Sequence, residues 1–154
     1  MTYEELLQSA DAEGIDVLEY HFASENIKGL YCDGTIALNR DIRTTSERAC
    51  ILAEELGHYY TSFGDIIDLT HSSNRKQEYH ARLWSYNNQV GLNGILSAYK
   101  AGCRNAHETA IHLGVTEEFL QEALTCYQQK YGVCTVLDNY AIYFEPTISV
   151  LELI

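Results

Sequence analysis

The chain has 154 residues, enough for one domain of ordinary size and too few for two full ones. Its net charge of −12 disfavours a direct nucleic-acid partner, because phosphate backbones are bound mainly by basic surfaces. The five cysteines form no Cys-x-x-Cys pair, the N-terminus is acidic, and no apolar run approaches the roughly 20 residues that cross a bilayer, so we expect a cytoplasmic protein with reduced thiols and no membrane partner.

The first forty residues predict a helix, a strand and a hairpin. Thr2 and Glu5 have the spacing of a capping box, which opens the helix. Residues 15–21 are rich in β-forming side chains and predict a strand. Residues 26–39 predict a hairpin that turns at Asp33-Gly34, a dipeptide favoured in two-residue hairpin loops.

A second helix is predicted from Thr44, where Thr44 and Glu47 repeat the capping-box spacing, to about Ser62. A polar loop is expected over residues 64–73, and a third helix over residues 74–88. The buried face of the second helix is predicted to consist of Ala49, Leu52, Ala53, Leu56 and Tyr60.

The last third of the chain predicts short helices at 95–101 and 106–113 and a long helix at 117–131. A closing hairpin is expected over 133–144. The apolar tail after Pro146 is expected either to pack on the body or to pair with another chain.

These elements predict a single α+β domain over residues 1–154, with a small antiparallel sheet packed against several helices. We expect its core to lie within residues 1–90, and residues 91–154 to form a helical and closing-strand region.

The most informative motif is Glu54-Glu55-Leu56-Gly57-His58, in the middle of the second predicted helix. It has the spacing of the His-Glu-x-x-His zinc-peptidase signature, with a glutamate in place of the first histidine. Glu54 and His58 are four residues apart, so they share one helix face and are candidate ligands of one metal ion. Glu55 projects about 100° away from Glu54 and is the candidate general base.

A catalytic zinc usually has three protein ligands, so a third ligand must come from elsewhere. We expect Glu78, near the start of the next long helix, because an antiparallel helix pair can return it to the motif. His80 on another face of that helix and His71 in the loop are the alternatives. Candidate helpers for a developing oxyanion are Tyr59, Tyr60, Tyr140, Tyr143 and His107.

Four ordered features resemble the ImmA/IrrE family of metallo-endopeptidases, which is common in prophages and mobile elements. They are the hairpin of residues 29–39, the helix start at 44–48, the motif at 54–59, and Glu78-x-x-Ala81-x-x-Trp84. The resemblance implies a zincin-like motif helix with Glu55 as general base and with His58 and Glu78 as metal ligands. Glu54 stands where the family has its first ligand histidine.

The resemblance implies a protein substrate, namely a repressor-type DNA-binding protein of a mobile element, and one divalent metal, Zn²⁺ or Mn²⁺. Two carboxylates and one imidazole carry a charge of −2, and carboxylate ligands suit harder ions such as Mn²⁺. We therefore expect a metal-dependent endopeptidase; the alternative is a catalytically silent scaffold that binds such a partner.

Residues 105–120 also match the pattern of a helix-turn-helix. The second helix of such a motif would place its first residues in the DNA major groove. Here those residues are Thr116-Glu117-Glu118, whose carboxylates would face phosphates. The acidity favours a helical hairpin that serves packing over a DNA-binding element.

Overall fold

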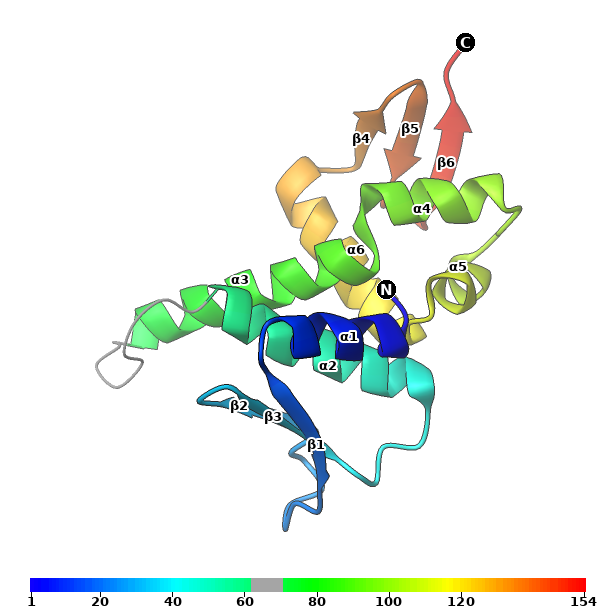
Figure 1. The fold of residues 1–154 in the computed structure, drawn as a ribbon. Coiled ribbons are helices and arrows are strands. Elements are labelled where there is room, and N and C mark those ends of the chain that lie inside the picture. Colours follow the sequence, from blue (N-terminus) through cyan, green and yellow to red (C-terminus); the bar gives the residue numbers. More distant parts are fainter. Residues whose placement is uncertain (62–70) are drawn as a thin grey trace. The chain divides into compact units, whose positions relative to one another are not determined.

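The computed structural model describes residues 1–61 and 71–154, without the side chains of residues 71–74, and it divides into two compact units, residues 1–85 and 86–154 (Figure 1). The mixture of helices with two separate three-stranded sheets confirms the predicted α+β class. The predicted loop at 64–73 lies largely outside the described residues.

The first unit begins with α1 (Tyr3–Ala12), followed by three strands, β1 (Asp16–Tyr20), β2 (Gly29–Cys32) and β3 (Thr35–Asn39). The capping box at the start of α1 is formed as predicted, with the Thr2 hydroxyl accepting from the Glu5 amide. β2 and β3 form the predicted antiparallel hairpin, and both turn residues, Asp33 and Gly34, have positive φ.

The strand order is β1-β3-β2, and β1 runs parallel to β3, whereas the sequence favoured a purely antiparallel sheet. The chain reverses once in residues 21–28 and again at the tight turn. Two reversals restore the original direction, so β3 lies beside β1 in the same sense. Both β1 and β2 are therefore edge strands of this sheet.

The motif helix is α2 (Thr45–Thr61), and it packs with α1 over the inner face of this sheet (Figure 1). The predicted buried face is confirmed, because Ala49, Leu52, Ala53 and Leu56 are buried and Tyr60 packs partly buried against the same core. Ile36 and Leu38 of β3, together with Leu6 and Ala10 of α1, complete that core.

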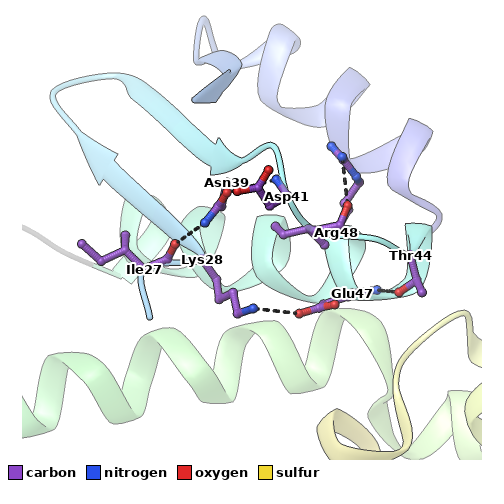
Figure 2. Close-up of polar contacts among 8 residues, drawn as sticks. Ile27, Lys28, Asn39, Asp41, Thr44, Glu47 and Arg48 are labelled. Carbon is purple, nitrogen blue, oxygen red and sulfur yellow. Dashed lines mark hydrogen bonds and ion pairs between the residues drawn. The ribbon is translucent and has the colours of Figure 1, made fainter. Parts of the chain in front are cut away.

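Polar contacts fix the start of α2 to the sheet (Figure 2). The Thr44 hydroxyl accepts from the Glu47 amide at 3.1 Å, and Glu47 pairs with Lys28 at 3.7 Å. Arg48 donates to the carbonyl of Ile42 at 3.1 Å and pairs with the carboxylate of Glu19 on β1. These contacts set the direction in which α2 leaves the sheet.

The helix α3 (His71–Gln89) begins slightly earlier than the predicted residue 74. It meets α2 where Gly57 lies against Ala81, a residue with no exposed surface. A Cβ atom added at Gly57 would collide with the carbonyl oxygen of Ala81 and lie 3.0 Å from its carbonyl carbon. Only glycine permits this approach of the two backbones.

The second unit contains α4 (Gly91–Lys100), α5 (Ala106–Leu113) and α6 (Glu117–Tyr131), followed by β4 (Cys134–Leu137), β5 (Tyr140–Tyr143) and β6 (Ser149–Glu152). The helices predicted at 106–113 and 117–131 are confirmed as α5 and α6, and Thr116 caps α6. The predicted closing hairpin is confirmed as β4 and β5. The apolar tail packs on the body, because β6 pairs antiparallel with β5.

The largest fully buried side chains of the second unit include Ile95, Leu120, Tyr127 and Ile142. Among the described residues, no helix is both long enough and apolar enough to cross a membrane.

Replacing Gly57 with alanine is expected to destabilise the protein by about 2 kcal/mol, because the added methyl group collides with backbone that cannot move freely. In an unhindered helix, the same substitution stabilises by roughly 1 kcal/mol. Chemical denaturation measures the change.

Gly94→Ala in α4 is the matched control. Its added Cβ would meet only the end of the Leu113 side chain, at 3.1 Å, which can rotate away. Equal stability changes in the two variants would contradict the role of Gly57.

Candidate metal centre

The candidate site lies on the face of α2 that carries Glu54, Glu55 and His58. All three residues are partly buried, and they lie in the middle of a 17-residue helix. Glu54 and His58 are one turn apart and so project from the same side. The rest of the helix is held by the core, so this face is presented on a rigid element.

The helix α3 brings Glu78 to His58. The Glu78 Oε2 atom lies 3.4 Å from His58 Nε2. Glu78 is one turn before Ala81, and His58 directly follows Gly57, so the close approach of the two backbones brings the Cα positions of both residues near each other. Of the two alternative ligands, His80 is exposed, and its ring centre lies 5.7 Å from the ring centre of Tyr79. The side chain of the other alternative, His71, lies outside the described residues.

Glu55 is enclosed by strand β2. The Tyr31 backbone amide donates a hydrogen bond to its carboxylate. A Cβ atom at Gly29 would lie 3.1 Å from Glu55 Cγ and 2.8 Å from Ile51 Cγ2, so only glycine leaves room for this side chain. The glycine belongs to the hairpin noted in the sequence, but its contact with Glu55 could not be read from the sequence.

The pKa of Glu55 is raised to about 7. Burial is the main cause, the negative charge of Glu54 is the second, and Glu78 adds a smaller repulsion. The hydrogen bond from Tyr31 opposes these effects without cancelling them. A carboxylate with this pKa accepts a proton near neutral pH far more readily than an ordinary glutamate.

Arg82 is a member of the site that sequence analysis missed. Its Nε atom lies 3.0 Å from Glu78 Oε1, one helical turn further along α3. The spacing of four residues between a glutamate and an arginine is a helix-pair signal, so the contact was detectable once the helix was predicted.

Two of the candidate oxyanion helpers in the first unit have partners. The Tyr59 hydroxyl donates to Glu13 at 3.2 Å, and this bond raises the pKa of Tyr59. Tyr60 stacks on Trp84 with ring centres 4.8 Å apart. Tyr140, Tyr143 and His107 belong to the second unit.

Within the described residues, no group of three or more His, Cys, Asp or Glu side chains converges closely enough to hold a metal ion. The pair of His58 and Glu78 nevertheless fits one. Two donors about 2.0–2.1 Å from a tetrahedral zinc lie roughly 3.3 Å apart, close to the observed separation of 3.4 Å. Glu54 is the predicted third donor on the same face of α2.

The chain was compared with protein-family models, curated proteins and solved structures. A family model described as IrrE N-terminal-like domain (Peptidase_M78) matches residues 10–125, which is more than half of the chain and includes α2 and α3 in full. No curated protein and no solved structure matches the chain.

In protein stripped of divalent ions, Glu55→Gln is expected to raise the free energy of unfolding at pH 8 by about 1 kcal/mol, a value that allows for screening of the charge by solvent. Near pH 4 the free energy of unfolding is expected to be unchanged. The folded-state pKa lies above the unfolded value of 4.5. The wild type therefore loses stability as pH rises from 4.5 through about 7, whereas a neutral glutamine does not.

Thermal denaturation with a chelator at pH 4, 6 and 8 measures this difference. Glu25→Gln, at an exposed position in the loop before β2, is the matched control and should not show the same trend. A wild-type to Glu55→Gln difference that stays constant with pH would contradict the raised pKa.

Proposed function

The chain belongs to the Peptidase_M78 family of IrrE N-terminal-like domains, and on this basis we propose that it is a metal-dependent endopeptidase. Membership points to a metallopeptidase, that is, a hydrolase that uses a divalent metal and acts on a protein. The observation that carries the proposal is a partly buried Glu55 with a pKa of about 7, beside an imidazole and carboxylate pair 3.4 Å apart.

The proposed metal ligands are Glu54, His58 and Glu78, and the proposed ion is Zn²⁺ or Mn²⁺. When bound, such an ion polarises a peptide carbonyl and lowers the pKa of a water molecule. The neighbouring positive charge also favours the ionised form of Glu55.

Glu55 is the proposed general base. Its carboxylate takes a proton from the attacking water and later gives that proton to the leaving amine nitrogen. The hydrogen bond from the Tyr31 amide stabilises the ionised form of this carboxylate. In the metal-free protein the pKa of Glu55 is about 7, and a bound cation would lower it, which leaves the carboxylate ionised and able to accept a proton.

The proposed substrate is a repressor-type DNA-binding protein of a mobile element, cleaved in the cytoplasm. The support is the resemblance of the four ordered features between residues 29 and 84 to the ImmA/IrrE pattern. The family match, over residues 10–125, supports the coarser statement that the substrate is a protein.

A catalytically silent binding protein is the second candidate, and the glutamate at position 54 favours it. Glu54 replaces an imidazole ligand with a carboxylate, so the donor set has a charge of −2. A less positive centre stabilises hydroxide less well, which weakens the nucleophile.

Metal content tests the proposed ligands. Mass spectrometry of the purified, untagged protein is expected to find about one divalent ion per chain, because three donors make a complete catalytic site. Glu54→Ala, His58→Ala and Glu78→Ala should each lose it, while Glu25→Ala should retain it. A wild-type protein that binds no ion after incubation with zinc or manganese would contradict the proposal that the chain is a metal-dependent endopeptidase.

Cleavage of a co-encoded repressor tests catalysis. Glu55→Gln is expected to lower the cleavage rate at least a hundredfold while the metal remains bound, because the proton acceptor is lost but the ligands are intact. A silent binding protein would instead bind the repressor without cutting it. Unchanged cleavage in Glu55→Gln would show that Glu55 is not the base.

Glu54→His tests the unusual ligand. The added imidazole suits zinc better than manganese, so the ratio of zinc to manganese affinity is expected to rise roughly tenfold, or about 1.4 kcal/mol. Calorimetric titration of both ions measures the ratio, with Glu54→Gln as the neutral control. An unchanged ratio would mean that residue 54 does not contact the ion.

A further inference from the structure

The two carboxylate oxygens of Glu78 have different partners. Oε1 lies 3.0 Å from Arg82 Nε, and Oε2 lies 3.4 Å from His58 Nε2. The arginine comes from the same helix as Glu78, whereas the histidine comes from α2. One carboxylate therefore has a neighbour at each of its two oxygens, a hydrogen-bond donor at Oε1 and an imidazole at Oε2.

Glu78 needs such a restraint. Its side chain is 46% exposed and has several rotatable bonds, so the close approach at Ala81 fixes its Cα position but not its carboxylate. The like charges of Glu54 and Glu55 lie on the facing helix, and Glu55 and Glu78 repel each other. Without a neighbouring cation, that repulsion would favour conformations in which Glu78 turns toward solvent.

The pair with Arg82 contributes little to folding. Exposed pairs four residues apart on a helix stabilise by about 0.3–0.5 kcal/mol. The main effect of the pair is therefore on the orientation of the Glu78 carboxylate. With Oε1 occupied by the guanidinium, Oε2 is the oxygen that faces the imidazole.

We propose that Arg82 is a positioning residue of the metal centre, which holds Glu78 Oε1 so that Oε2 remains beside His58 as a ligand for the divalent ion. This inference rests on the proposed function, because it assumes that Glu78 and His58 bind a metal. Groups that orient metal ligands commonly change metal affinity by 10–100-fold when they are removed.

The test measures zinc and manganese affinity by competition with a chromophoric chelator. Arg82→Gln is expected to bind each ion about tenfold more weakly than the wild type. Arg82→Lys keeps a cation four residues after Glu78 and should recover most of the loss. Lys76→Gln removes the same charge from an exposed position of α3 and should leave affinity unchanged.

A double-mutant cycle shows whether Arg82 acts through Glu78. In a Glu78→Gln background, whose amide oxygen can still bind the ion weakly, Arg82→Gln should cause no further loss of metal affinity. Circular dichroism in chelator is expected to be unchanged by Arg82→Gln, and the melting temperature is expected to fall by no more than about 2 °C, which excludes unfolding as the cause.

Several results would overturn the inference. They are an Arg82→Gln affinity equal to or tighter than the wild type, an equal effect from Lys76→Gln, no recovery in Arg82→Lys, or the same tenfold loss when Glu78 is already glutamine. In each case the wild type still binds metal, so only the role of Arg82 fails. A wild type that binds neither ion would refute the proposed function as well.

Discussion

The contact between Gly57 and Ala81 is the constraint on which the candidate site depends. At this point the backbones of α2 and α3 approach so closely that a single methyl group would collide with a carbonyl oxygen. His58 follows the glycine directly, and Glu78 precedes the alanine by one turn. The close approach therefore brings the backbones of these two residues near each other, and their imidazole and carboxylate lie 3.4 Å apart.

Burial and the negative charges at the candidate site raise the proton affinity of Glu55. The charges of Glu54 and Glu78 repel the carboxylate of Glu55, and this repulsion combines with burial to raise the pKa of Glu55 to about 7. Such repulsion is costly without a compensating charge. Arg82 supplies part of that positive charge beside Glu78 Oε1. A divalent ion bound at Glu78 Oε2 would supply more. The amide of Tyr31 stabilises the charge of Glu55 from the side of the sheet.

Local chemistry made much of the fold predictable. Hydroxyl side chains at Thr2 and Thr116 specify where helices begin, and Asp33-Gly34 specifies a tight turn. These signals act within a few residues, so they survive in any tertiary context. The parallel placement of β1 beside β3 depends on how two chain reversals combine in space, and no local pattern reports it. The sequence likewise left open whether the apolar tail packs on its own chain or pairs with another, and in the structure its strand β6 pairs with β5.

The same division applies to the site. Helical periodicity is enough to assign Glu54, Glu55 and His58 to one helix at the spacing of a metal-peptidase motif, and it made Glu78 a candidate. The packing of α3 and β2 on α2 decides that Glu78 rather than His80 lies beside His58, and that Gly29 and Tyr31 enclose Glu55. The structure also places Arg82 beside the second oxygen of Glu78. The physical reason is that periodicity says which residues share a face, whereas close packing between elements decides which faces meet.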